Sequence, residues 1–335
     1  MKNWLFIPLI FVVTTIFGQQ IDRIAFGSCS FQFGKQKIWK SVVAKNPQLW
    51  VWLGDVIYSD IGGMGKSMSE KFAQADANLN YNLLKQTCPI IATWDDHDYG
   101  GNGAIGNFAT KKESKQIFLD HFKVPEYDPR RTRDGIYTSY TYGEGQNKIK
   151  VILLDTRYNS ENPGPESDML GENQWKWLKD EFENSDAKVN IIGSSIQFVA
   201  DVPTFENWDK FPKSQKRMLD MIGQTKVKGV VFISGDVHFS ETSKRKYDEI
   251  DYPIYDLTSS GLTHGNNVQG INKNPYRVGK SRYGRHNFGF IDVDWKSEKL
   301  TFTEFDTKGI TRYKQDIFFS EIGWQLPVIN TPSKD

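Results

Sequence analysis

The chain has 335 residues and a formal net charge of +1, with 42 Lys and Arg residues against 41 Asp and Glu residues. This balance argues against a nucleic-acid or membrane-surface partner, because both attract an excess of positive charge. The length suits one large domain or two small ones, and the aromatic content of 14% suits a large core.

The N-terminal residues differ from the rest of the chain. Lys2 precedes a nearly apolar run from Trp4 to Phe17, and Gly18 follows. A short positive start, an apolar run and a small residue are typical of a secretory signal, and the run is short for a membrane span of ~20 residues. We therefore expect a signal peptide at 1–18, no stable membrane span after its cleavage, and a periplasmic or extracellular single domain at 19–335. A retained N-terminal anchor is the alternative.

Strand and helix patterns then alternate, which predicts βαβ units and mostly parallel pairing. No internal repeat or long Pro/Gly linker divides the chain, so we expect two sheets stacked within one domain. The predicted strands span 21–30, 49–53, 89–94, 136–142, 148–155, 189–193, 230–234, 254–258, 288–295 and 300–305. The predicted helices span 37–46, 69–86, 111–122, 174–182 and part of 207–221, with a flexible loop at 60–67.

Three predicted strands end in clusters of polar side chains. The segments are Gly54–Tyr58, Trp94–Asp98 and Gly235–His238. Aspartates this crowded repel one another unless cations neutralise them. Strand ends are also where α/β proteins usually build sites. These segments predict a metal site.

The residue types within these segments indicate which chemistry the metal supports. Asp55 and Tyr58 lie three residues apart, so both can reach one ion, and a phenolate favours a trivalent metal such as iron. Asp236 and His238 flank one residue, and alternate side chains of an extended segment point the same way. Carboxylate, phenolate and imidazole together suit a two-metal hydrolase that acts on phosphate esters.

At these segments the chain resembles the PhoD-type alkaline phosphatases, metallophosphoesterases related to the calcineurin-like and purple acid phosphatases. The likeness runs from about Ile24 to Phe290. It rests on Gly27–Cys29, Gly54–Tyr58, Trp94–Asp98, Leu154–Tyr158, Met169–Glu172 with Gln174, Gly235–His238 and Ser259–Gly261.

The resemblance implies a four-layer α/β/β/α sandwich with two mixed sheets and metals at the strand ends. It implies an iron(III) ion held by Cys29, Asp55, Tyr58 and His238. Asp55 would bridge to a second ion, calcium or another divalent metal, that Asp96 and Asp236 also bind. Asn102 would bind there or at a third ion, His97 would act on the leaving group or the phosphoryl oxygens, and Arg157 would clamp the phosphate.

Two departures from the family pattern bear on the substrate. A β-sandwich domain often precedes the Gly-Ser-Cys strand, and only two residues separate the expected signal from Ile21, so we expect that domain to be absent. The form Asp-Asp-His-Asp replaces the commoner Asp-Asp-His-Glu. We therefore expect an exported phosphoesterase for a small-molecule, lipid or nucleotide ester, with the choice between monoesters and diesters open. The alternative is a non-catalytic exported protein that binds calcium or carbohydrate.

Some residues keep two interpretations. Cys29 is a metal ligand or forms a disulfide with Cys88. His121, on a predicted helix, is expected to be structural, whereas His264 and His286 either line the site or are structural.

Overall fold

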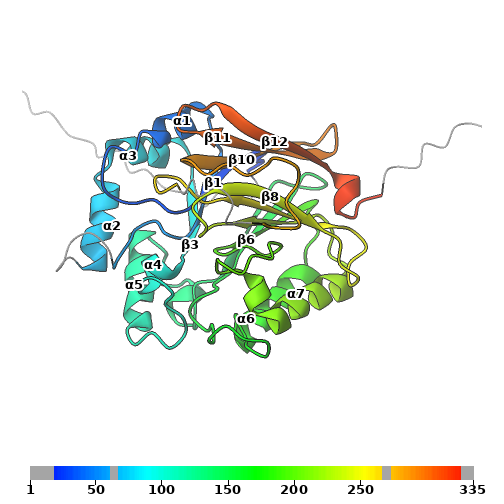
Figure 1. The fold of residues 1–335 in the computed structure, drawn as a ribbon, viewed down its shortest axis with the longest axis horizontal. Helices are drawn as coiled ribbons and strands as arrows, with labels where there is room; N and C mark the ends of the chain where they lie inside the picture. Colours follow the sequence, from blue (N-terminus) through cyan, green and yellow to red (C-terminus); the bar gives the residue numbers. More distant parts are fainter. Residues whose placement is uncertain (1–18, 61–66, 266–272, 326–335) are drawn as a thin grey trace, which may run out of the picture.

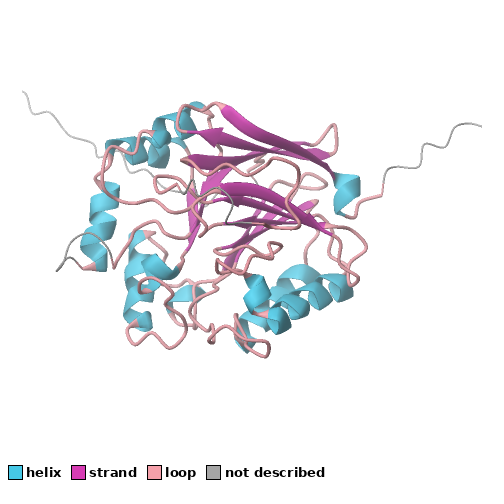
Figure 2. Ribbon diagram, viewed as in Figure 1, coloured by secondary structure: helices cyan, strands magenta, loops and turns pink. Residues whose placement is uncertain are grey.

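The computed structural model describes residues 19–60, 67–265 and 273–325. Two mixed six-stranded sheets lie against each other at its centre (Figures 1 and 2). The first sheet has the order β12 (Thr311–Phe318), β11 (Lys299–Asp306), β10 (Asn287–Asp294), β1 (Arg23–Gly27), β2 (Leu49–Leu53), β3 (Ile90–Thr93). The second has the order β4 (Thr138–Tyr142), β5 (Ile149–Leu153), β6 (Val189–Ser194), β7 (Val230–Ser234), β9 (Ile254–Ser259), β8 (Ser240–Arg245).

Parallel strands form the part of each sheet that carries the predicted site. Strands β1, β2 and β3 are parallel in the first sheet, and β5, β6, β7 and β9 are parallel in the second. Antiparallel strands complete both sheets, and the predicted pairs β4–β5 and β10–β11 are present. The expected α/β fold with two mixed sheets is confirmed.

Helices cover the outer faces of the two sheets, which gives four layers (Figure 1). The helices are α1 (Ile38–Ala44), α2 (Met68–Asp76), α3 (Leu79–Thr87), α4 (Asp96–Tyr99), α5 (Lys111–His121), α6 (Glu172–Glu183) and α7 (Pro212–Thr225). Short 3-10 helices span Pro129–Arg131, Trp208–Lys210 and Phe319–Ile322.

Strand β2 explains how the layers are held together. Its side chains alternate between two apolar clusters. Val51 and its neighbours two residues away pack between the sheets, whereas Trp50 and Trp52 pack under the helices. Trp39 of α1 lies 5.1 Å and 5.4 Å, between ring centroids, from these two tryptophans. A strand covered on both faces is apolar throughout, and all five residues of β2 are buried.

The predicted continuous helix at 69–86 is wrong. The chain forms two helices there, because Asn78 begins a new one by accepting hydrogen bonds from the backbone N–H groups of Asn80 and Tyr81. Strands β8 and β12 were not predicted, since neither carries an apolar run.

The predicted signal peptide at 1–18 and most of the predicted loop at 60–67 lie outside the described residues. Within the part of the chain that is described, no helix is both long and apolar enough to cross a membrane.

Candidate metal centre

Three predicted ligands occupy the same place in three different strand–loop junctions. Cys29, Asp55 and Asp236 each lie two residues beyond the end of a buried parallel strand, with φ angles of 59°, 50° and 68°. A non-glycine residue with positive φ is uncommon, and such conformations cluster at functional sites. Gly54, with φ of +95°, is required before Asp55, because a Cβ atom there would lie 2.3 Å from the Cβ of Asp95.

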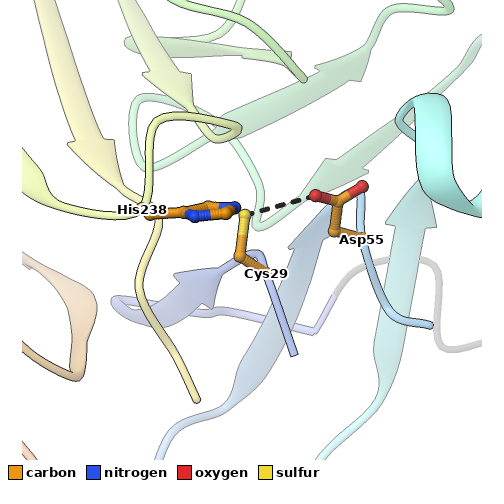
Figure 3. A group of neighbouring side chains, drawn as sticks. All are labelled: Cys29, Asp55 and His238. Carbon is orange, nitrogen blue, oxygen red and sulfur yellow. Dashed lines mark hydrogen bonds between the residues drawn. The ribbon is translucent and has the colours of Figure 1, made fainter. Parts of the chain in front are cut away.

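Cys29, Asp55 and His238 point toward one another from these junctions (Figure 3). The thiol of Cys29 lies 3.4 Å from Oδ2 of Asp55 and 3.2 Å from the hydroxyl of Ser260. The phenol oxygen of Tyr58 lies 3.2 Å from Nε2 of His238. The four residues predicted to hold the first ion are therefore brought together.

The other aspartates extend this group into a second, adjoining one. Ligand atoms of Asp55, Asp96 and His97 lie within 4.8 Å of one another, as do those of Asp95, Asp96 and Asp236. Asp55 belongs to both the thiol-containing group and the first of these. This placement matches the predicted bridging position of Asp55, although its ligand role stays a prediction.

The electrostatics of the two groups favour cations. Burial, and then the charge of Asp96, raises the pKa of Asp55 well above its ordinary value. Burial, and then the charge of Asp95, does the same for the pKa of Asp236. Oδ1 of Asp55 is buried and has no hydrogen-bond partner. A metal ion would satisfy this oxygen and offset the repulsion between carboxylates.

The donor types fit two different ions. Burial lowers the pKa of His238 to about 4, so its imidazole is neutral near pH 7, as a metal ligand must be. Burial, and then the charge of Asp55, raises the pKa of the Cys29 thiol, so a metal is needed to hold it as a thiolate. Thiolate, phenolate and imidazole suit iron, whereas the group of Asp95, Asp96 and Asp236 offers only oxygen and suits a hard divalent cation.

His97 is held by a carboxylate that sequence analysis did not select. Its Nδ1 donates to Oδ1 of Asp60 at 2.6 Å, and its ring lies 4.2 Å from that of Tyr58. Burial would raise the pKa of Asp60, but hydrogen bonds from the Asn102 backbone and from His97 outweigh it and lower the pKa. Asp60 lies two residues after Tyr58 in the same loop, so its position in the sequence was a usable signal.

Arg157, the predicted phosphate clamp, is buried and does not face solvent. Its side chain is 3% exposed, and Nε donates to Oδ1 of Asp95 at 2.6 Å. Nη1 lies 2.6 Å from Oε2 of Glu206. The phosphate-clamp role of Arg157 stays a prediction. So does the ligand role of Asn102, which is exposed and whose backbone N–H donates to Asp60.

The structure bears on the open interpretations of the two cysteines and of two histidines. Both cysteines are free and buried, and Cys88 belongs to the apolar cluster under the helices, so the disulfide is not formed in this structure. His264 lines the site, with Nδ1 3.3 Å from the phenol oxygen of Tyr58. His121 stacks on Phe72 at 4.1 Å, in keeping with a structural role.

Comparison with known proteins identifies the family of the chain. The family model described as PhoD-like phosphatase matches residues 24–303. The chain belongs to the PhoD-like phosphatase family. It is 25% identical over 276 residues to alkaline phosphatase D of Bacillus subtilis (strain 168), a match that covers 67% of this chain and 47% of that protein. The chain thus spans about half the length of this curated relative.

Two solved structures share the fold. The structure of PhoD superposes with a TM-score of 0.71 at 19% identity, covering 89% of this chain and 69% of that one. GAP50, described as the anchor in the inner membrane complex of Plasmodium, superposes with a TM-score of 0.56 at 12% identity, covering 90% and 89%. At these identities the likeness shows the fold alone.

Proposed function

We propose that this protein is an exported, metal-dependent phosphoesterase that hydrolyses phosphate monoesters, diesters or both. The observation that carries the proposal is the continuity of the site: Asp55 joins the thiol-containing group to the group that contains Asp96, and Asp96 joins it to Asp236. Adjoining ion sites with shared carboxylates are the arrangement of two-metal hydrolases. Export rests on the N-terminal sequence, and membership of the PhoD-like family supports the ester class.

The protein's residues divide the work of such a reaction. Bound ions would activate a water molecule and hold the phosphate oxygens. Asp60 accepts the Nδ1 proton of His97, which fixes the ring, and in the imidazolium form Nε2 would donate a hydrogen bond to a phosphoryl oxygen or to the leaving oxygen. The Arg157 guanidinium lies beside Asp95, where its positive charge offsets part of the carboxylate charge.

A non-catalytic role is the competing hypothesis. The fold does not decide, because GAP50 shares it and is described as an anchor. Catalysis is favoured because every predicted metal ligand except Asn102 lies in the site. The deciding experiment is to assay metal-loaded protein against a panel of phosphate monoesters and diesters. Absence of turnover on every ester, at full metal occupancy, would reject the phosphoesterase and leave calcium or carbohydrate binding.

The identity of the ions gives a spectroscopic prediction. We propose iron(III) beside Cys29, Tyr58 and His238 and calcium beside Asp96 and Asp236. A phenolate bound to iron(III) absorbs visible light through charge transfer, so the purified protein should be coloured. Tyr58→Phe should abolish the phenolate band, and Cys29 should leave a separate thiolate band in that variant.

Tyr99→Phe is the matched control for this prediction. The Tyr99 hydroxyl donates to the backbone carbonyl of Ile105, outside the proposed ligand set, so the visible spectrum should not change. Metal analysis of the same samples measures iron directly. A colourless, iron-free protein with full activity would reject iron(III) and favour a pair of divalent ions.

A further inference from the structure

A carboxylate at the edge of the site is not used by the proposed reaction. Glu206 lies in the loop between β6 and the 3-10 helix Trp208–Lys210, with its side chain 42% exposed. Its Oε2 forms an ion pair with Nη1 of Arg157, 2.6 Å away, although Arg157 itself is buried. Glu206 is therefore half-exposed, and its carboxylate pairs with a buried arginine of the site.

Two observations place the charge of Glu206 beside the aspartates. A Cβ atom on Gly103 would lie 3.9 Å from its Oε1, and the backbone N–H of Gly103 donates to Oδ2 of Asp96 at 2.6 Å. After burial and Asp95, Glu206 is the next cause that raises the pKa of Asp236. Glu206 thus faces the oxygen-lined part of the site.

Arg157 does not neutralise this carboxylate fully. Its single positive charge is shared between Asp95 and Glu206, which leaves one surplus negative charge in the trio. A substrate held by an ion bound at Asp96 and Asp236 would lie near that charge. Near pH 8 a phosphomonoester is a dianion, because its second pKa is about 6, whereas a phosphodiester is a monoanion. Repulsion is proportional to substrate charge, so it acts twice as strongly on the monoester.

We propose that Glu206 is a specificity residue that biases the site toward monoanionic phosphodiesters and against dianionic phosphomonoesters. The proposal rests on the proposed phosphoesterase function and names its preferred ester class. Because Glu206 is half-exposed, water screens its charge. At about 6 Å in water, one charge on Glu206 weakens binding by a factor of about 3 for each negative charge on the substrate.

The test is Glu206→Gln, which removes the charge and keeps a side-chain oxygen that can accept from Arg157. We expect kcat/KM at pH 8 to rise about 3-fold for bis(p-nitrophenyl) phosphate and about 10-fold for p-nitrophenyl phosphate, because the energetic effect doubles with the charge. Glu166→Gln is the matched control, since Glu166 is 88% exposed and its nearest cation, Lys213, is 3.6 Å away. It should change neither value.

Equal factors for the two esters would overturn the proposal. A fall for both would also overturn it, and would mean that Glu206 organises Arg157 instead. A binding measurement separates this proposal from the proposed function. Titration calorimetry of metal-loaded protein should show that Glu206→Gln tightens inorganic phosphate about 10-fold and dimethyl phosphate about 3-fold at pH 8. If the wild type hydrolyses neither ester, the function fails, and these two affinities still decide the role of Glu206.

Discussion

Removing the bound metals with a chelator should lower the melting temperature by about 8 °C at pH 8 and by clearly less at pH 5. An ion present at a thousand times its dissociation constant stabilises the folded state by about 4 kcal/mol, and each kcal/mol is worth roughly 2 °C in a chain of this size. The comparison needs thermal melts of metal-loaded and chelated protein at both pH values.

The pH dependence follows from carboxylates whose pKa is raised in the metal-free fold. Burial raises the pKa of Asp95 to about 6, despite Arg157, and raises the pKa of Asp55 and Asp236 well above the ordinary value. A carboxyl group whose pKa is higher in the folded than in the unfolded state stabilises the fold fully below its unfolded pKa, about 4. This stabilisation is lost as the pH rises through the folded pKa. For Asp95 the loss falls between about pH 4 and 6. The metal-free protein therefore becomes less stable as the pH rises toward 8. In the metal-loaded protein, bound cations neutralise the same aspartates that protons neutralise at low pH.

Asp96→Ala provides the internal comparison for the chelator experiment. It removes one ligand and one repelling charge, so metal content and activity should fall together while the metal-free variant is no less stable than metal-free wild type. Asp120→Ala, at an exposed carboxylate on α5, should leave the chelator effect unchanged. An identical chelator shift at pH 5 and pH 8 would mean that the aspartates are not neutralised by the ions.

The strand ends of the site were predictable because buried strands are apolar, so the point at which each strand stops is visible in the sequence. Strands β2 and β7 are covered on both faces, so they read as uninterrupted apolar runs with a Gly-Asp pair at the end. Strands β2 and β7 lie in different sheets, and the stacking of the two sheets, which places Gly235 against Leu53, brings Asp55 and Asp236 together. Assigning Tyr58 and Cys29 to the same group needed the family resemblance as well.

The two unpredicted strands lack that signature for different physical reasons. Strand β12 lies at a sheet edge and is largely exposed, so nothing selects apolar residues along it. Strand β8 is also an edge strand, but Ser240 to Ser243 are buried, and the side chains of Glu241 and Ser243 form hydrogen bonds with residues distant in the chain. Glu241, for example, accepts from Gln197 and Asn274. From the sequence alone, such a polar strand cannot be distinguished from a polar loop.

The side-chain pairs that shape the site were equally inaccessible from one sequence. Asp60 and His97 are 37 residues apart, and their contact depends on how two loops meet. Glu206 lies in a loop with no motif, and only the fold brings it to Arg157. Sequence patterns located the candidate ligands at the strand ends, whereas the contacts of Asp60 and Glu206 depend on tertiary packing.

His97→Ala should lower kcat about 100-fold while the protein keeps its metals and its melting temperature. A hydrogen bond from an imidazole to charge that develops in the transition state is worth ~3 kcal/mol. Asp60→Asn should lower kcat about 10-fold, because it removes the carboxylate that holds Nδ1 of His97. If Asp60 acts through His97, the double variant should be no slower than His97→Ala alone.

Metal content, melting temperature and kcat on the same samples decide among three roles for His97. Its ring nitrogen lies within 4.8 Å of ligand atoms of Asp55 and Asp96, so a metal-binding role predicts that His97→Ala loses an ion along with activity. A packing role, through the contact with Tyr58, predicts a lower melting temperature and unchanged turnover per folded, loaded molecule. Only the catalytic role predicts that His97→Ala keeps full metal occupancy and stability but has a lower kcat. It also predicts that adding Asp60→Asn to His97→Ala lowers kcat no further. Additive losses in the double variant would show that Asp60 contributes independently, for example by touching an ion or the substrate, since a carboxylate that serves only to orient the imidazole has no effect once the imidazole is gone.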